Sequence, residues 1–254
     1  MSGFKDHFSS ASGRYAAYRP DYPAALYDWL AGQCPRSRTS TAHDTAWDCA
    51  TGSGQAALGL AAHFRRVIAT DASVEQIRHA LPHPAIDYRE ASAESSGLAD
   101  ASVDLVTVAQ AAHWFDLPRF YAEVERVLKP GGMLALWGYG RMVLPGDLDA
   151  PFLRFYAETV GPYWPPERQR IDDAYRSLDF PFPEIDAPAF FIEVDWTLDR
   201  LLDYVSTWSA VKRFQTAQGH DPLPALRAEL APAWGDTARP RRLAWPLFVR
   251  CGRR

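Results

Sequence analysis

The segment of residues 47–55 constrains the fold of this chain more than any other part of the sequence. A short apolar lead ends at the acid Asp48, and two glycines follow at Gly52 and Gly54 in G-x-G spacing. A second apolar run ends at another acid, Asp71. Glycines let the backbone approach a ligand closely, and a carboxylate at the tip of a second strand can accept both hydroxyls of a ribose. If the two turns face one crevice, we expect an adenosine site there.

Strand and helix patterns alternate from about residue 45 to residue 138, which predicts a parallel sheet with helices on both faces. Apolar runs typical of buried strands cover residues 66–71, 104–110, 133–137, 189–194 and 243–249. In sheets of this kind a ligand binds outside the C-terminal ends of the strands. We therefore expect Gly52, Asp71 and Gln110 to converge at one edge of the sheet.

Two helices have recognisable beginnings in the same region. Ser73 starts a capping box with Gln76, which places a helix just after the second strand. Asp116 is placed to cap the helix that precedes the Lys-Pro-Gly-Gly segment. In that helix Phe120 belongs to the apolar face, and we expect Glu123 to face water.

The glycine loop is compatible with more than one class of protein. Residues 52–57 also fit G-x-G-x-x-A, the phosphate-binding turn of nicotinamide-dependent oxidoreductases. Asp48 argues against that interpretation, because a carboxylate beside the loop would repel a pyrophosphate. An acid there suits a ligand with a positive end, such as the ammonium or sulfonium of S-adenosylmethionine. A non-catalytic S-adenosylmethionine-binding module that acts through a protein partner is a further alternative.

Three further segments resemble one enzyme family. They read Ala-Ala-His-Trp-Phe-Asp at residues 111–116, Arg-Val-Leu-Lys-Pro-Gly-Gly at 126–132 and Tyr-Ala-Ala-Tyr-Arg-Pro-Asp-Tyr-Pro at 15–23. This order resembles the class I S-adenosylmethionine-dependent methyltransferases of the methyltransferase type 11 group, and within them the branch of trans-aconitate methyltransferase. The resemblance implies a doubly wound, mostly parallel seven-stranded Rossmann-like sheet with an antiparallel last strand. One residue departs from the pattern, since the family usually has glycine where this chain has Ala50.

The resemblance also implies which residues hold the cofactor, S-adenosyl-L-methionine. Asp71 is expected to bind the ribose, Gln110 to form a wall beside the methionine end, and residues 92–94 to flank the adenine. The expected cofactor-binding residues are Asp48, Ala50, Thr51, Gly52, Gly54, Gln55, Asp71, Ala72, Ser92, Ala93, Glu94 and Gln110.

Candidate residues for the methyl acceptor come from two other segments. Trp114 is expected to wall the acceptor pocket, and His113 to hydrogen-bond the acceptor or take its proton, although the pair also fits a packed aromatic corner. Tyr15 and Arg19 belong to an N-terminal element that resembles the family's cover over the cofactor. Arg19 is suited to hold a carboxylate bidentately, or to tie the N-terminus down by a salt bridge.

The chemistry of methyl transfer requires little from the protein beyond positioning. The methyl donor is already activated, so the protein must orient the acceptor and exclude water, and it needs no metal. A neutral acceptor would require a general base, whereas a carboxylate would require a cation. By analogy with the branch, we expect O-methylation of a small-molecule carboxylate.

The length, charge and cysteine content of the chain are those of a globular enzyme without metal or nucleic-acid ligands. With 254 residues, 47% hydrophobic, the chain can bury one substantial core, and its net charge of −4 gives no electrostatic footprint for nucleic acid. Three cysteines without metal-ligand spacing indicate neither a disulfide framework nor a metal site. Without a signal-like or membrane-spanning segment, we expect a soluble cytoplasmic monomer or homodimer.

We expect a single methyltransferase domain over residues 1–254. Residues 141–188 contain eight prolines and eight aromatic residues and show little strand alternation. Such a long insertion is typical of a functional lid over a ligand crevice. The expected parts are an N-terminal helical cap at 1–40, a cofactor-binding core at 45–140, the lid at 141–188 and the C-terminal part of the sheet at 189–254.

Overall fold

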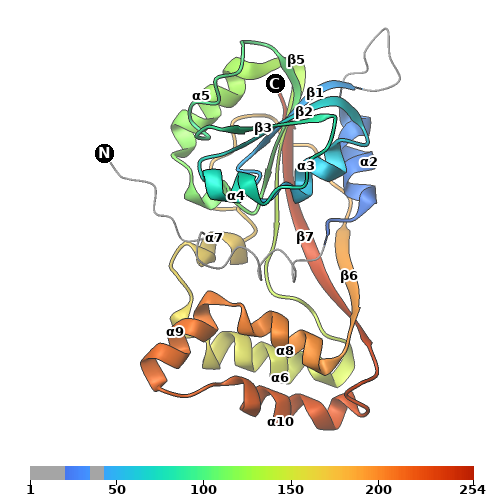
Figure 1. Cartoon of the computed structure of the whole chain (residues 1–254), viewed down its shortest axis with the longest axis vertical. Coiled ribbons are helices and arrows are strands. Elements are labelled where there is room, and N and C mark those ends of the chain that lie inside the picture. The colour runs from blue at the N-terminus through green and yellow to red at the C-terminus, as the bar shows by residue number, and fades with distance from the viewer. Residues whose placement is uncertain (1–20, 35–42) are drawn as a thin grey trace.

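A computed structural model describes residues 21–34 and 43–254 of the chain. Seven strands form one sheet in the order β3-β2-β1-β4-β5-β7-β6 (Figure 1). The strands are β1 (His43–Cys49), β2 (Phe64–Asp71), β3 (Ile86–Glu90), β4 (Val103–Ala109), β5 (Leu128–Tyr139), β6 (Phe190–Trp196) and β7 (Arg241–Arg253). Only β7 runs antiparallel to its neighbours β5 and β6. The predicted seven-stranded, mostly parallel sheet with an antiparallel last strand is confirmed.

Helices cover both faces of the parallel part of the sheet (Figure 1). On one face, α2 (Ala24–Gln33) and α3 (Gln55–Leu60) bury Leu30 and Leu60 in a core shared with β1 and β2. On the other face, α5 (Leu117–Val127) buries Phe120 against β4. The strand β4 is apolar and almost wholly buried because helices lie on both of its sides.

The expected helix starts are confirmed. The hydroxyl of Ser73 accepts a hydrogen bond from the backbone N–H of Gln76 at the start of α4 (Val74–Arg78), and Asp116 caps α5 through the N–H of Arg119. Two details differ from the sequence-based expectation. Glu123 does not face water, because a polar network described below draws its carboxylate inward. The Lys-Pro-Gly-Gly segment precedes the strand expected at 133–137, but it forms the irregular first part of β5, where the pairing with β4 shifts register.

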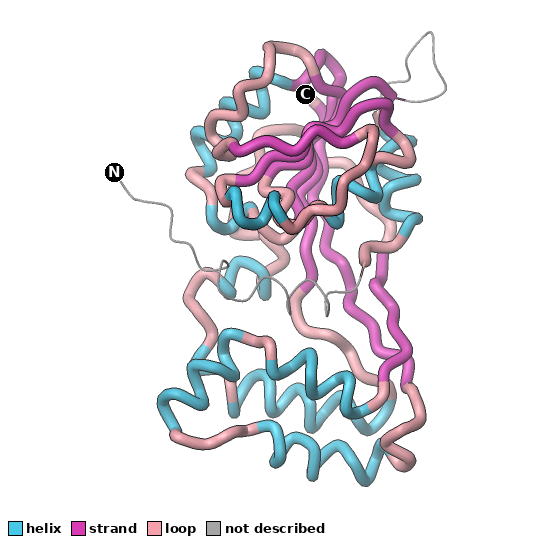
Figure 2. Tube along the Cα trace, viewed as in Figure 1, coloured by secondary structure: helices cyan, strands magenta, loops and turns pink. Residues whose placement is uncertain are grey.

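A second layer of helices lies beyond the sheet, where the long strands β6 and β7 reach it (Figure 2). It contains α6 (Asp149–Arg154), a π-helix η3 (Phe155–Thr159), α8 (Leu198–Ser206), α9 (Ser209–Gln218) and α10 (Leu223–Trp234). Phe152 and Phe155 share one buried core with Leu201, Leu230 and Trp234. We call this unit the helical layer. It is assembled from two stretches of chain, one of which lies within the insertion at 141–188 and the other outside it.

The short helix α7 (Arg168–Asp172) stands between the sheet and the helical layer (Figure 1). Its Ile171 and the following Tyr175 are buried in the core beside α5 rather than in the core of the helical layer. The insertion therefore contacts both parts of the molecule. None of the helices in residues 21–34 and 43–254 is long and apolar enough to cross a membrane.

Candidate functional site

The glycine loop and the tip of β2 lie against each other, as the sequence predicts. The N–H of Thr51 donates to the carbonyl of Thr70 at 2.9 Å, and the N–H of Gly52 donates to Oδ2 of Asp71 at 2.8 Å. The parallel pairing of β1 with β2 sets this arrangement, since Cys49 lies opposite Thr70. The two turns thus form one edge at the C-terminal ends of the strands.

Asp71 is half-buried and accepts two backbone hydrogen bonds. Besides Gly52, the N–H of Ser73 donates to its Oδ1 at 2.8 Å. Burial raises the pKa of this carboxyl, and the two backbone donors act in the opposite direction. A carboxylate has about four acceptor positions, so two backbone donors leave capacity for a pair of hydroxyl groups.

Asp48 is fully buried beneath the loop. The hydroxyl of Thr51 donates to its Oδ2 at 2.6 Å, and the hydroxyl of Thr107 on β4 donates to its Oδ1 at 2.8 Å. Desolvation raises the pKa of the Asp48 carboxyl to about 6, although the two hydroxyl bonds lower it. A negative charge held at this place would be stabilised by a positive group above the loop.

Two non-glycine residues at the strand tips have left-handed backbones. Ala50 follows β1 with φ 54°, and Gln110 follows β4 with φ 58°. Such conformations cost about 1 kcal/mol each for a residue with a Cβ, and they concentrate at functional sites. Two of the left-handed non-glycine residues therefore lie at the two turns that the sequence assigned to a ligand.

The two loop glycines are required for different reasons. Gly52 has φ 58°, and a Cβ added there would meet no atom within 4 Å, so its face is open for a ligand. Gly54 has φ 88°, and an added Cβ would clash with the ring and hydroxyl of Tyr88 on β3. Tyr88 was not among the expected site residues. Next to the loop, Gln55 accepts a hydrogen bond from the hydroxyl of Ser53 at 3.2 Å.

The segment after β3 starts beside Asp71, because the N–H of Ala91 donates to the carbonyl of Asp71 at 3.1 Å. It contains Ser92, the buried Ala93 and Glu94, whose Oε1 accepts from the N–H of Asp116 at 3.1 Å. On the other side of Asp71, Ala72 is exposed. We call the segment of residues 91–96, which starts at the tip of β2, the rim.

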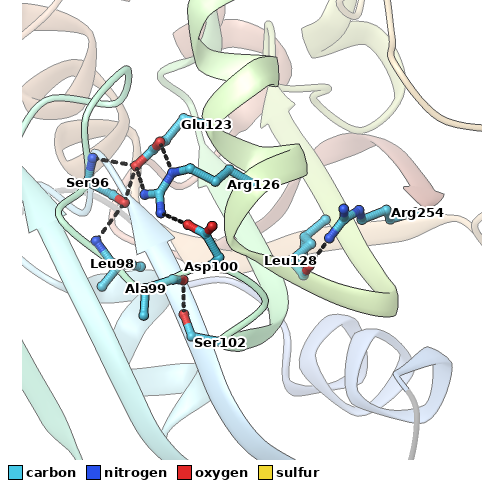
Figure 3. A network of polar contacts seen from close by, with 9 residues as sticks. All are labelled: Ser96, Leu98, Ala99, Asp100, Ser102, Glu123, Arg126, Leu128 and Arg254. Carbon is cyan, nitrogen blue, oxygen red and sulfur yellow. Dashed lines mark hydrogen bonds and ion pairs between the residues drawn. The ribbon is translucent and has the colours of Figure 1, made fainter.

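A polar network fixes this segment to α5 (Figure 3). The N–H and hydroxyl of Ser96 donate to Oε1 of Glu123 at 2.8 and 2.5 Å. Arg126 donates to both carboxylate oxygens of Glu123 and, through Nη1, to Asp100 at 2.5 Å. The hydrogen bonds from Arg126 are the largest cause that lowers the pKa of Glu123, to about 2. The buried charge of Glu123 thereby holds the rim in place.

Gln110 lies at the tip of β4, as predicted, with its side chain turned toward β5. Its Nε2 donates to the carbonyl of Tyr139 at 2.9 Å, and its backbone N–H donates to the carbonyl of Trp137 at 2.9 Å. The tips of β4 and β5 are therefore joined by this one residue.

His113 and Trp114 belong to a short 3-10 helix, η1 (Ala112–Trp114), that follows Gln110. The Nδ1 of His113 lies 2.9 Å from the hydroxyl of Tyr175, and Nη1 of Arg170 donates to the carbonyl of His113 at 2.9 Å. The side chain of Trp114 is 39% exposed and contacts the His113 ring at a centroid distance of 4.7 Å. No motif in the sequence pointed to Tyr175, which comes from the proline- and aromatic-rich insertion.

A cavity of about 470 Å³ opens between the end of β5 and the insertion. Gly140, the residue after β5, lines it together with Arg141, Tyr156, Asp172, Leu247 and Phe248. Because Gln110 bonds the carbonyl of Tyr139, the cavity begins one residue from the tip that joins β4 and β5. Of the expected acceptor residues, Tyr15 and Arg19 lie outside the described residues.

Comparison with known proteins decides the family. A family model described as a methyltransferase domain matches residues 47–136. A protein of Dictyostelium discoideum that is named a methyltransferase is 38% identical over 237 residues, which cover 92% of this chain and 88% of that protein. The chain belongs to the class I S-adenosylmethionine-dependent methyltransferases.

Further relatives of this methyltransferase support the assignment over most of its length. A protein of Mycobacterium bovis that is named an uncharacterized methyltransferase is 34% identical over 193 residues, covering 75% of this chain and 70% of that one. A solved structure from Anaeromyxobacter dehalogenans, described as a type II methyltransferase, is 46% identical with a TM-score of 0.87 and covers 92% of this chain and 97% of that chain. The agreement includes the helical layer as well as the sheet.

The residues at the strand tips fit S-adenosylmethionine, the cofactor of this family. The open face of Gly52 gives room for a ligand above the loop, and Asp71 retains acceptor capacity. The buried carboxylate of Asp48 complements a positively charged group. A pyrophosphate at the loop would instead lie above the buried carboxylate of Asp48, which argues against the oxidoreductase interpretation.

Proposed function

We propose that this methyltransferase transfers a methyl group to a carboxylate of a small-molecule acid, as an enzyme related to the trans-aconitate methyltransferase branch. The observation that carries the proposal is the cavity beside Gly140, which is lined by aromatic and apolar residues together with the charged residues Arg141 and Asp172. A cavity of about 470 Å³ is of the size that takes a small organic molecule. A carboxylate acceptor is already a nucleophile, so it needs a cation and a dry pocket more than it needs a base.

Each part of the cofactor site has a role in this proposal. Asp71 accepts the ribose hydroxyls, and residues 92–94 flank the adenine. The charge of Asp48 favours the positive end of the ligand. Gln110 separates the methionine end from the acceptor cavity. When bound, the cofactor would supply an activated methyl group: its bond to sulfur breaks as the acceptor oxygen bonds the methyl carbon, and S-adenosylhomocysteine leaves.

His113 and Trp114 act on the acceptor side. Trp114 covers the entrance between η1 and the insertion. The imidazole of His113, held by Tyr175, orients the acceptor through a hydrogen bond. Arg19 and Tyr15 are proposed to complete the cover from the N-terminal element.

The insertion at 141–188, part of which belongs to the helical layer, is proposed to act as a lid together with the rest of that layer. Limited proteolysis with and without S-adenosylhomocysteine tests this, because a lid becomes protected when the ligand binds, whereas a fixed segment is cut equally in both. The chain is further proposed to act as a cytoplasmic monomer or homodimer without a nucleic-acid partner, in line with its net charge of −4.

The proposed reaction has a direct test. The protein is incubated with methyl-labelled S-adenosylmethionine and a panel of small carboxylic acids that includes trans-aconitate. Methyl esters are hydrolysed by base to volatile methanol, so we expect label that base converts to a volatile form. Transfer of label into products that survive base would contradict carboxylate methylation and would indicate N- or C-methylation.

A further inference from the structure

A second cavity of about 370 Å³ adjoins the first. Tyr156, Ala157 and Asp172 line both cavities, whereas Trp164 and Arg168 line only the second. The two spaces together lead from Gly140, at the end of β5, to the guanidinium of Arg168 on α7.

Arg168 is held firmly, but only through one of its three nitrogens. Its Nε donates to the hydroxyl of Tyr156 at 3.1 Å and to Oδ1 of Asp172 at 3.2 Å. The guanidinium carbon lies 4.8 Å from the centre of the Trp164 ring, and the side chain is only 22% exposed. Within residues 21–34 and 43–254, no group accepts a hydrogen bond from Nη1 or Nη2 of Arg168. A stacked guanidinium with these two nitrogens uncommitted is suited to bind a planar anion bidentately.

The other arginine that lines these cavities, Arg141, uses both of its terminal nitrogens in hydrogen bonds within the protein. Nη1 of Arg141 donates to Asp149 and to the carbonyl of Met142, and its Nη2 donates to Asp149 at 3.1 Å. Arg141 therefore fastens the chain after β5 to α6. Arg168 is the better candidate for a ligand.

A second donor beside Arg168 also lacks an acceptor. The indole N–H of Trp164 is buried and makes no hydrogen bond within the described part of the chain. Buried donors are nearly always paired, so an unpaired one indicates a missing partner. An anionic oxygen at the edge of the Trp164 ring, beside Arg168, is the kind of group that would pair it.

We infer that Arg168 anchors an anionic group of the methyl acceptor at the end of the molecule farther from the atom that receives the methyl. The acceptor class is an elongated organic anion whose distal group is a carboxylate or a phosphate. This inference rests on the proposed function only in taking the cavity beside Gly140 as the acceptor site. The carboxylate of Asp172, which is paired with Arg168, repels an anion and so weakens its attraction to Arg168. An acid therefore needs contacts with the apolar cavity as well to bind tightly.

Three probes of equal chain length test the anchor: hexanoate, hexyl phosphate and hexan-1-ol. They are titrated by NMR into the full-length protein saturated with S-adenosylhomocysteine. We expect both anions to bind the wild type more tightly than the alcohol. Arg168→Gln should weaken both anions by about tenfold or more and leave the alcohol unchanged. Asp172→Asn keeps an acceptor for Arg168 and Tyr156 but removes the like charge, so it should tighten both anions. The comparison of hexanoate with hexyl phosphate identifies the preferred anion.

Arg176→Gln is the matched control, because Arg176 follows the same helix, lines neither cavity and, among the described residues, donates only to the carbonyl of Asp173. It should bind all three probes like the wild type. Unchanged S-adenosylhomocysteine affinity and melting temperature show that each variant is folded. Equal anion binding by Arg168→Gln and wild type, or no preference of the wild type for the anions, would overturn the inference. Anion binding that depends on Arg168 without formation of base-labile methyl esters would overturn only carboxylate methylation.

Discussion

The Nδ1 of His113 lies 2.9 Å from the hydroxyl of Tyr175, although 62 positions separate the two residues. Tyr175 is fully buried, and both it and Ala174 have left-handed backbones with φ 60° and 58°. The carbonyl of Tyr175 accepts from Nη1 of Arg250 on β7 at 2.7 Å. The insertion is thus tied to the last strand, and through Tyr175 it fixes the ring of His113.

Tyr175→Phe removes this hydroxyl while keeping the ring. We expect turnover to fall roughly tenfold, and His113→Ala to lower it about a hundredfold, with S-adenosylhomocysteine affinity near wild type in both. Nitrogen NMR of the His113 ring should show a changed hydrogen-bonding state in Tyr175→Phe. If the ring signals of Tyr175→Phe match those of wild type, the hydroxyl does not position His113.

The buried Asp48 predicts a pH-dependent cofactor affinity. Its carboxyl has a pKa raised to about 6, mainly by desolvation, so it loses its charge as the pH falls through this value. Because the ligand has a positive ammonium group, we expect S-adenosylhomocysteine to bind roughly tenfold more weakly at about pH 5 than at about pH 7.5. Calorimetry across this range measures the change. Asp48→Asn should bind weakly with little pH dependence, and an equally steep profile in that variant would assign the effect to another group.

Ala50 offers a test of the departure from the family pattern. Its φ of 54° is strained for alanine and unstrained for glycine. Ala50→Gly should therefore raise the free energy of unfolding by about 0.5–1 kcal/mol and tighten S-adenosylhomocysteine, since the added methyl narrows the approach to the loop. Denaturant unfolding measures the change in stability, and calorimetry measures the change in affinity for S-adenosylhomocysteine. Reduced stability together with weaker binding would show that the methyl group contributes useful packing.

The Glu123 network links stability to pH with a definite sign. The carboxyl has a pKa lowered to about 2, so its stabilisation is complete above the ordinary pKa of about 4.3 and is lost as the pH falls toward 2. Glu123→Gln should lower the free energy of unfolding at neutral pH by about 2 kcal/mol and flatten this acid limb. Asp100 is exposed, so Asp100→Asn should lower the free energy of unfolding much less. Equal losses in the two variants would show that burial of Glu123 adds nothing.

The sequence predicted the convergence of Gly52 and Asp71 because parallel strands end at one edge of a sheet. It predicted the caps at Ser73 and Asp116 because capping depends on residues only a few positions apart. The partners Tyr88, Tyr175 and Arg168 could not be predicted, since their contacts depend on how distant segments pack. The expectation that Glu123 faces water was wrong, because an amphipathic pattern does not show that Ser96 and Arg126 provide partners for a buried charge. The contributions of Tyr15 and Arg19 stay predictions, as they lie outside the described residues.

Titration calorimetry with S-adenosylhomocysteine and with NAD tests the central claim most directly, that the edge formed by the glycine loop and Asp71 is the S-adenosylmethionine site. We expect the wild type to bind S-adenosylhomocysteine and not NAD. Asp71→Ala should weaken S-adenosylhomocysteine by roughly 30- to 150-fold, which corresponds to about 2–3 kcal/mol for the loss of a charged acceptor of two hydroxyls. Because Asp71 also holds the N–H groups of Gly52 and Ser73, Asp71→Asn, which retains one acceptor, should show a smaller loss. Binding of NAD in preference to S-adenosylhomocysteine, or an unchanged S-adenosylhomocysteine Kd in Asp71→Ala, would contradict the account.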